Sequence, residues 1–152
     1  MFVRDLMAKN VVTVSSTESF SEIVKLLVRK KITGVPVINK KGKVISIISE
    51  KDLFYRLFPS QEEFYKDLEY FTHFNNIEKD AKRVIKLKAK NIMSKKIISV
   101  CSDDHIMRAC SLFVIHNIRR LPVIDDGKLV GIVTTNNIYK NFLNTLVKNN
   151  KK

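Results

Sequence analysis

Two short motifs in this 152-residue sequence place a carboxylate or an amide three residues after a hydroxyl. They are Ser49-x-x-Asp52 and Thr134-x-x-Asn137. A hydroxyl can cap the N-terminus of a helix, where free backbone N–H groups also make a seat for phosphate or sugar oxygens. A carboxylate can accept hydrogen bonds from two vicinal hydroxyls. The motifs therefore predict helix starts that bind a ligand. The alternative is that Ser49 is only a cap and Asp52 is an acid favoured by the helix dipole.

Each motif ends a longer stretch, 33–54 or 119–139, that predicts a strand, a turn, a second strand and a helix start. The turns, 39–42 and 125–127, contain the Asn, Asp and Gly residues that hairpins need. The expected strands are 35–38, 44–48, 121–124 and 129–133. Each hydroxyl is thus expected where a second strand passes into a helix.

The similarity between these stretches extends over most of the chain. At an offset of 86 residues, Met7 matches Met93 and Pro36 matches Pro122. Upstream, we expect a strand at 11–14 and a helix at about 19–31, capped by Ser19 or else by Ser16 or Thr17. The second copy predicts a strand at 97–100 and a helix capped within 102–104. Self-similarity at a fixed period indicates a duplicated unit, here an α+β unit of order β-α-β-β-α that occurs twice.

Composition narrows the class of protein. With 45% hydrophobic residues, four Gly and three Pro, the chain is expected to be globular, and no apolar run is long enough to span a bilayer. Cys101 and Cys110 lack metal-ligand spacing and predict free thiols of a cytosolic protein, with Cys110 in the core. The net charge of +13 favours an anionic partner (nucleotide, nucleic acid or acidic protein), or else only a solvated lysine-rich surface.

The segment between the repeats, 55–88, is not explained by the duplication. Phe64, Leu68 and Phe71 stand at helical spacing, which predicts burial against the repeats or across a dimer contact, with ligand stacking as the alternative. Ser60 and Glu63 have the spacing of a helix cap, and residues 79–90 form a basic connector.

The ordered set of motifs closely resembles a CBS-domain pair, or Bateman module. The similar features are Asp5 to Met7 and Asn91 to Met93, the Pro-Val strands, and the hydroxyl-x-x-Asp/Asn ends. The resemblance implies one module made of repeats 1–54 and 89–144, with a helical linker, 55–88, and a basic tail, 145–152. It also implies packing about a pseudo-twofold axis that leaves two clefts. Such clefts commonly bind AMP, ADP, ATP or S-adenosylmethionine.

The resemblance assigns roles to residues of a first cleft. Asp52 would hold the ribose hydroxyls, and Ser49 would contact ribose or phosphate. Adenine would lie against Ile97 and Ile98, and phosphates would meet Arg119 and Arg120. Because successive strand residues face opposite ways, only one of these arginines is expected to point inward.

The second cleft departs from the family pattern. Asn137 replaces the aspartate, and Thr33 and Gly34 stand where the first cleft has arginines. We expect this cleft to be empty or to hold an uncharged adenosine compound. Its residues would be Val11, Val12, Thr13, Thr33, Gly34, Thr134 and Asn137.

The sequence therefore predicts a cytoplasmic, non-catalytic regulatory module that senses an adenosine ligand and acts on an unidentified protein. The resemblance implies a homodimer built on the helices. An enzyme finds little support, because the chain shows no nucleophile-base-acid set, metal-ligand cluster or phosphate-binding glycine loop. The alternatives are a basic nucleic-acid-binding protein, although no nucleic-acid-binding motif is present, and a scaffold or dimerisation protein with non-functional clefts.

Overall fold

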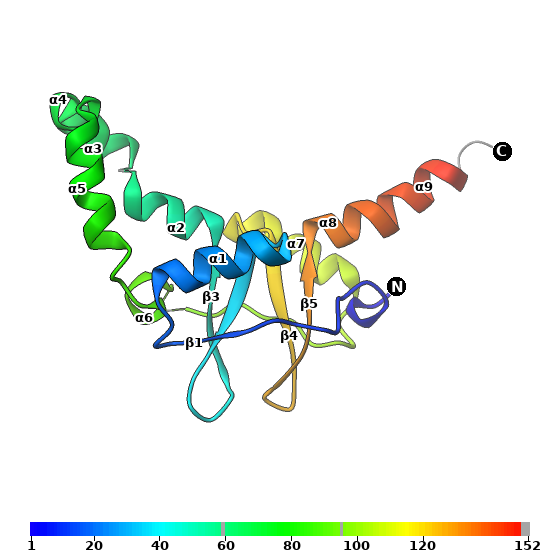
Figure 1. The fold of residues 1–152 in the computed structure, drawn as a ribbon. Helices are drawn as coiled ribbons and strands as arrows, with labels where there is room; N and C mark the ends of the chain where they lie inside the picture. The colour runs from blue at the N-terminus through cyan, green and yellow to red at the C-terminus, as the bar shows by residue number, and fades with distance from the viewer. Residues whose placement is uncertain (59, 95, 150–152) are drawn as a thin grey trace. The chain divides into compact units, whose positions relative to one another are not determined.

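A computed structural model describes residues 1–58, 60–94 and 96–149 of the chain (Figure 1). Its internal contacts divide the chain into two compact units. The first-hairpin unit consists of Thr13–Lys96, and the second-hairpin unit consists of Met1–Val12 and Ile97–Lys152. Of the expected basic tail, residues 150–152 lie outside the described part. No helix among the described residues is both long enough and apolar enough to span a bilayer.

The first-hairpin unit contains a sheet of three strands in the order β1 (Val14–Ser15), β2 (Gly34–Ile38) and β3 (Val44–Ser49). β2 and β3 pair antiparallel, as predicted, and Gly42 adopts a φ of 75° in the turn, where a side chain would be strained. The predicted strand at 11–14 is wrong in extent. Only Val14 and Ser15 pair with β2, in parallel, so the ladder begins at Val14.

The predicted first helix is confirmed as α1 (Phe20–Lys30). Ser19 caps it by accepting a hydrogen bond from the Glu22 N–H at 3.2 Å. The inner face carries Phe20, Ile23 and Leu27, which are all buried. The apolar Val28 of the same helix is 73% exposed, because only part of the apolar stripe meets the sheet.

A series of short helices covers the linker and the residues on either side of it in the first-hairpin unit. They are α2 (Glu50–Leu57), α3 (Gln61–Lys66), α4 (Leu68–Thr72), α5 (Phe74–Val84) and α6 (Ala89–Ile92). The predicted cap at Ser60 and Glu63 is confirmed, since Ser60 Oγ accepts from the Glu63 N–H at 3.3 Å.

The expected burial of the linker residues against the repeats is wrong. Leu68 is 49% exposed, and Phe64 and Phe71 are only half-buried. The two phenylalanine rings instead stack on each other, with centroids 6.2 Å apart. Burial across a dimer contact stays a prediction.

In the second-hairpin unit, β4 (Arg120–Asp125) and β5 (Lys128–Thr134) form the predicted antiparallel hairpin. The helical elements described in this unit are η1 (Val3–Asp5), α7 (Ile106–His116), α8 (Thr135–Ile138) and a π-helical turn η2 (Tyr139–Leu143) that continues into α9 (Asn144–Asn149). The predicted strand at 97–100 is reduced to one parallel bridge, between Val100 and Val123.

The cap of α7 was also predicted wrongly. His105, and not a residue within 102–104, caps the helix, because its Nδ1 accepts from the Met107 N–H at 3.4 Å. Asp104 closes the preceding turn instead, where its carboxylate accepts from the Cys101 N–H at 2.8 Å.

The leading segment of each repeat, which precedes its first strand, belongs to the unit of the other hairpin. Residues 1–12 belong to the second-hairpin unit, and residues 89–96 belong to the first-hairpin unit. Ala8 and Ile132 exchange two backbone hydrogen bonds, both 2.9 Å long, which bind the N-terminal segment to β5. Gly131 makes this close approach possible, since a Cβ there would lie 3.1 Å from the Ala8 carbonyl oxygen. At the corresponding place in the first-hairpin unit, the buried Ser46 donates its hydroxyl to the Ser94 carbonyl at 2.9 Å.

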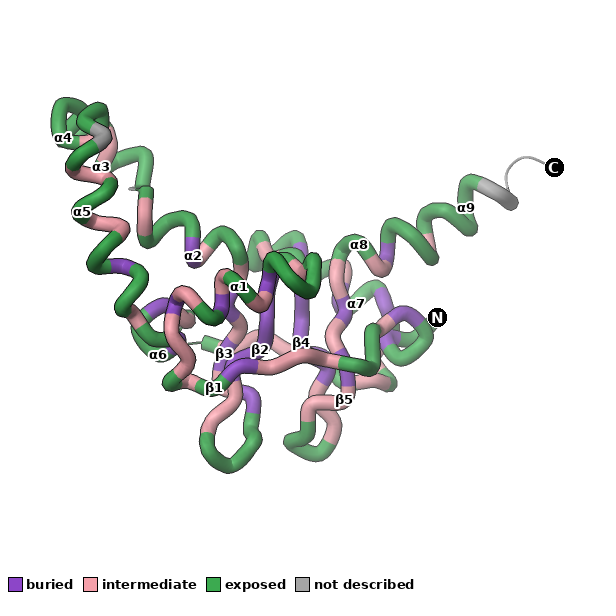
Figure 2. Tube along the Cα trace, viewed as in Figure 1, coloured by how far each residue is buried: buried purple, intermediate pink, exposed green. Residues whose placement is uncertain are grey.

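Each unit has its own apolar core, in which the inner strand positions meet the inner faces of the helices (Figure 2). In the first-hairpin unit the buried residues include Val14, Phe20, Ile23, Leu27, Val35, Val37, Val44, Ile48, Leu53, Val84, Ala89 and Ile92. The core of the second-hairpin unit contains Val3, Leu6, Val100, Ile106, Ala109, Phe113, Leu121, Val123, Val133 and Ile138. These cores hold β3 and β5 in place, and so fix where the two hydroxyl motifs begin.

Candidate functional site

Ser49 and Asp52 lie together at the junction of β3 and α2, as predicted. The backbone N–H and the hydroxyl of Ser49 donate to Asp52 Oδ2, at 2.7 and 2.5 Å respectively. In return, the Asp52 N–H donates to Ser49 Oγ at 3.3 Å. This reciprocal cap fixes both side chains before any ligand arrives.

Backbone groups occupy much of the remaining start of α2. The Glu50 N–H donates to the Thr33 carbonyl at 3.0 Å, and the Asp52 N–H is taken by Ser49. Within the described residues, the Lys51 N–H is the first-turn donor that lacks such a partner. The predicted seat for ligand oxygens is therefore reduced to one backbone N–H group and the carboxylate of Asp52.

Thr134 and Asn137 form the equivalent cap at the junction of β5 and α8. The backbone N–H and the hydroxyl of Thr134 donate to Asn137 Oδ1, at 2.9 and 2.6 Å. The Asn137 N–H returns a bond of 3.2 Å to Thr134 Oγ1. The carbonyl of Arg119 accepts from the Thr135 N–H at 3.0 Å, just as Thr33 does at α2.

The two caps differ in the atom that remains for a ligand. At Asp52, both bonds from Ser49 end on Oδ2, and Oδ1 remains as a charged acceptor. At Asn137, the side-chain oxygen Oδ1 is used by the cap, because the Thr134 N–H that it binds is a donor. The Nδ2 group of Asn137 therefore remains for a ligand, and this group can only donate hydrogen bonds. Sugar hydroxyls that donate hydrogen bonds thus find a carboxylate oxygen at the first motif, whereas the remaining amide group of Asn137 at the second motif cannot accept from them.

The arginines differ in exposure, as expected from strand alternation. Arg120 is the first residue of β4 and is 9% exposed, whereas Arg119 is exposed. Ile97 and Ile98 are half-buried, and Ile98 packs against the core of the second-hairpin unit. These four residues belong to the second-hairpin unit and Ser49 and Asp52 to the first. Their assembly into one site stays a prediction.

The residues expected in the second site are also distributed over both units. Val11, Val12, Thr134 and Asn137 belong to the second-hairpin unit, and Thr13, Thr33 and Gly34 to the first. Gly34 is buried as the first residue of β2, and Thr33 is exposed. The structure brings Thr134 to Asn137, and it brings Thr33 to α2 through its carbonyl. Sequence reasoning missed these carbonyl contacts of Thr33 and Arg119, for which side-chain chemistry carries no signal.

The cysteines and the acids form no further reactive site in the described part of the chain, where no group of His, Cys, Asp and Glu could hold a metal ion. Cys101 is an exposed free thiol. Cys110 packs against the core, as expected, and its burial raises the pKa of the thiol.

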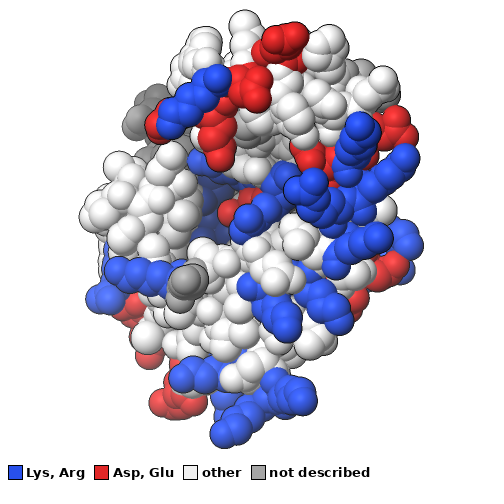
Figure 3. Space-filling view, turned by 90° about the vertical axis from the view of Figure 1, so that its left-hand side faces the viewer, with Lys and Arg blue, Asp and Glu red and all other residues white. Residues whose placement is uncertain are grey.

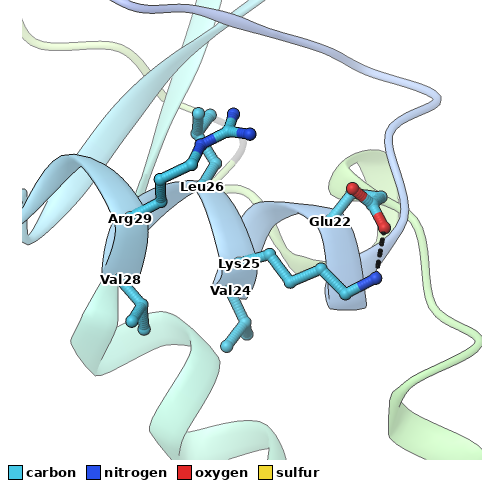
Figure 4. A pocket seen from close by; sticks show the side chains of 6 residues that line it. All are labelled: Glu22, Val24, Lys25, Leu26, Val28 and Arg29. Atoms are coloured by element: carbon cyan, nitrogen blue, oxygen red, sulfur yellow. Dashed lines mark hydrogen bonds and ion pairs between the residues drawn. The ribbon is translucent and has the colours of Figure 1, made fainter.

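A surface depression of about 470 Å³ lies over α1 and is distinct from the predicted ligand site (Figure 4). Its lining comes from one helix and includes Val24 and Val28, which point to the same side of α1. Lys25 pairs with Glu22 at 2.7 Å along the same helix. Neither Ser49 nor Asp52 lines this depression, so it adds nothing to the predicted adenosine site.

Comparisons with known proteins agree with the duplicated motifs. A family model described as the CBS domain matches residues 3–58 and 89–144. An uncharacterised protein of Methanocaldococcus jannaschii, MJ1426, is 33% identical over 146 residues, which cover 88% of this chain and 86% of the relative. A longer relative from Methanopyrus kandleri, the uncharacterised protein MK0525, is 32% identical, and the chain spans 60% of its length.

Two similar solved structures contain adenosine compounds. The CBS domain pair of MJ0100, in complex with 5′-methylthioadenosine and S-adenosyl-L-methionine, has a TM-score of 0.71 and 25% identity, covering 95% of this chain and 98% of that one. CBSX2 in complex with AMP has a TM-score of 0.72 and 28% identity, with the same coverage of 95% and 98%. The predicted resemblance, the α+β class and the two repeats are thereby confirmed, whereas packing about a pseudo-twofold axis stays a prediction.

Proposed function

Because the chain belongs to the CBS domain family, we propose that it is a non-catalytic regulatory module that binds an adenosine-containing ligand at Ser49 and Asp52. The observation that carries this proposal is the free Oδ1 of Asp52, which remains after Oδ2 has accepted both bonds of the helix cap. An oxygen with two lone pairs can accept from two vicinal hydroxyls. AMP, 5′-methylthioadenosine and S-adenosyl-L-methionine, the ligands of the similar structures, all contain such a ribose.

The rest of the ligand would meet residues of the second-hairpin unit. We assign the adenine to Ile97 and Ile98, and the phosphates to Arg119 and Arg120. Arg119 is the exposed member of the arginine pair and is therefore the better candidate for a ligand that arrives from solvent. The set around Asn137 is the weaker site, because its remaining amide group cannot accept from the ribose.

The module would act on an unidentified protein through a change in its own conformational equilibrium. A ligand shifts such an equilibrium only by the difference between its affinities for the two conformations. A ligand that contacts both units would have different affinities for the two conformations, because the geometry of its contacts would depend on the conformation.

We further propose that the chain forms a homodimer through its helices. The two repeats expose the same apolar position, since Val28 of α1 is 73% exposed and Val114 of α7 is 82% exposed. Ile115, next to Val114, is 71% exposed as well. Light scattering of Val28→Asp/Val114→Asp would show a monomer if these positions lie in the dimer contact.

A thermal-shift panel of AMP, ADP, ATP, S-adenosylmethionine and NAD tests the proposed function. A ligand that binds the folded chain at about 100 times its Kd stabilises it by about 2.7 kcal/mol. Asp52→Asn should abolish most of this shift and retain the fold, because asparagine can keep the cap with its oxygen, as Asn137 does.

Glu50→Gln is the matched control. It removes one negative charge from the first turn of the same helix without touching the cap. We expect this variant to keep the shift of the wild type. The proposal would be refuted if no adenosine compound stabilised the chain. If Asp52→Asn and Glu50→Gln lost the thermal shift equally, Asp52 would act only through its negative charge and not through contact with the ligand.

A further inference from the structure

Positive charge concentrates in residues 79–96, at the end of the linker and the start of the second repeat. This stretch holds eight of the 28 Lys and Arg residues of the chain and one acid, Asp80. It therefore carries more than half of the net charge of +13. Figure 3 shows the side of the molecule on which α5 and α6 lie in Figure 1, and Lys and Arg side chains spread over it.

The helix α5 presents a basic row to solvent. Its inner face consists of Ile77 and Ala81, which are half-buried, and the buried Val84. The exposed residues Lys79, Lys82 and Arg83 of α5 are three or four positions apart, so they form one row along the outer face, and the exposed Lys86 follows in the turn after the helix. Cations in this row recur about once per helical turn, at roughly 5.4 Å. The exposed Lys88 and Lys90 extend the basic surface to α6.

The nearby acids do not neutralise this row. Glu78 pairs with Lys82 at 3.3 Å, and Asp80 pairs with Arg83 at 3.6 Å. Asp80 also accepts a hydrogen bond from the Tyr70 hydroxyl at 3.1 Å. Among the described residues, no ion pair reaches Lys79, Lys86, Lys88 or Lys90. Four exposed cations therefore remain without an internal counter-charge.

Exposed aromatic rings lie next to this surface. Tyr70 connects α4 to α5 through Asp80, and its ring packs edge-on against Phe71, with centroids 5.2 Å apart. Phe71 stacks on Phe64, which in turn contacts Tyr65 with centroids 6.0 Å apart. Tyr65 is 71% exposed at the outside of this cluster. The hydrogen bond of Tyr70 to Asp80 holds this cluster against α5. Exposed rings and cations on the same helical segment are the combination that single-stranded nucleic acids require, for base stacking and for phosphate contacts.

We propose that the surface formed by Lys79, Lys86, Lys88, Lys90 and Tyr65 binds single-stranded nucleic acid. A membrane surface fits less well, because a helix that binds at the interface inserts its apolar face into the lipid, and α5 uses that face to pack inside its own unit. This binding is independent of the adenosine ligand, since neither Ser49 nor Asp52 belongs to the surface.

The test measures fluorescence anisotropy of a labelled oligouridine of about 12 nucleotides, within the usual range of single-strand site sizes. With four phosphate contacts, the slope of log K against log salt should be about −2.8, which corresponds to roughly a 50-fold loss between about 50 and 200 mM salt. The variant Lys79→Gln/Lys86→Gln/Lys90→Gln should reduce the magnitude of that slope by about 2. Tyr65→Ala should weaken binding about fivefold or more with the slope unchanged.

The variant Lys40→Gln/Lys41→Gln/Lys43→Gln is the matched control, since it removes the same charge from the β2–β3 turn of the same unit. We expect it to keep the slope of the wild type. Equal effects of the two triple variants, or no binding at low salt, would overturn the proposal. Inorganic polyphosphate that competes as well as the RNA, combined with no effect of Tyr65→Ala, would overturn it in favour of a general anion surface. Binding to anionic lipid vesicles but not to RNA would overturn it in favour of a membrane.

Discussion

The start of α2 and the start of α8 share one backbone design and differ in the atom that each leaves to a ligand. In both, a hydroxyl residue caps the helix and a residue before the preceding hairpin supplies a carbonyl. Asp52 keeps an acceptor after capping, and Asn137 keeps a donor. The shared part explains why both motifs fold in the same way. The difference shows that one substitution can change the ligand preference without affecting the helix start.

The largest expected difference between the repeats is at the strand position that faces the leading segment, which is Gly131 in β5 and Ser46 in β3. Gly131→Ser should destabilise the chain by about 1–3 kcal/mol, because its Cβ would lie 2.5 Å from the Met7 sulfur and 3.1 Å from the Ala8 carbonyl oxygen. Serine already occupies the corresponding position in the first-hairpin unit, where Ser46 is buried and hydrogen-bonded. Urea unfolding measures the effect.

Ser46→Gly is the reciprocal variant. It should cost about 1 kcal/mol, from one lost hydrogen bond and the added flexibility of glycine. A Gly131→Ser variant as stable as the wild type would show that the two leading segments are held in equivalent ways after all.

The second difference concerns phosphate. Arg119 is exposed, whereas the matching residue, Thr33, is uncharged. Arg119→Ala should weaken AMP by about 1.5 kcal/mol, the low end for a charged hydrogen bond, because solvent screens an exposed side chain. Adenosine should bind with nearly unchanged affinity. Calorimetric titration of both ligands gives the comparison. A loss for adenosine as large as the loss for AMP would remove Arg119 from the phosphate site.

The smallest expected difference lies in the hairpin turns. Hydrogen bonds from the hydroxyl and then the backbone N–H of Ser102 lower the pKa of Asp125 in the folded chain. A carboxyl with a lowered pKa stabilises the fold above its unfolded pKa, and this contribution is lost as the pH falls through the folded pKa. The matching residue, Asn39, cannot ionise. Thermal unfolding of Asp125→Asn between about pH 3 and 6 should show a weaker dependence on pH than the wild type. Identical pH profiles would exclude this contribution.

The features that depend on local chemistry could be predicted from the sequence. Neighbouring residues were enough to predict both hairpins, the helix α1 and the helix caps at Ser49, Ser60 and Thr134. The hairpins and the caps at Ser49 and Thr134 also occur at matching places in the two repeats, which supported the prediction. Contacts between residues distant in sequence could not be predicted. The hydrogen bonds of Ala8 with Ile132 are backbone bonds, as are those made by the Thr33 and Arg119 carbonyls, and any residue type can form them.

The weak edge strands show the same limit. The apolar runs at 11–14 and 97–100 resemble strands, yet within them only Val14 and Val100 pair with a strand. Helical spacing in the linker predicted that Phe64 and Phe71 are buried, but it could not show that they lie on two separate helices, α3 and α4, and stack on each other.

The central claim is that the free carboxylate oxygen of Asp52 binds the ribose hydroxyls. Calorimetric titration of adenosine and 2′,3′-dideoxyadenosine against the wild type and Asp52→Asn tests it most directly. The wild type should prefer adenosine by about 1.5–3 kcal/mol for each charged hydrogen bond, and Asp52→Asn should lose most of that preference. An equal preference in both proteins would contradict the claim, because the hydroxyls would then be bound elsewhere.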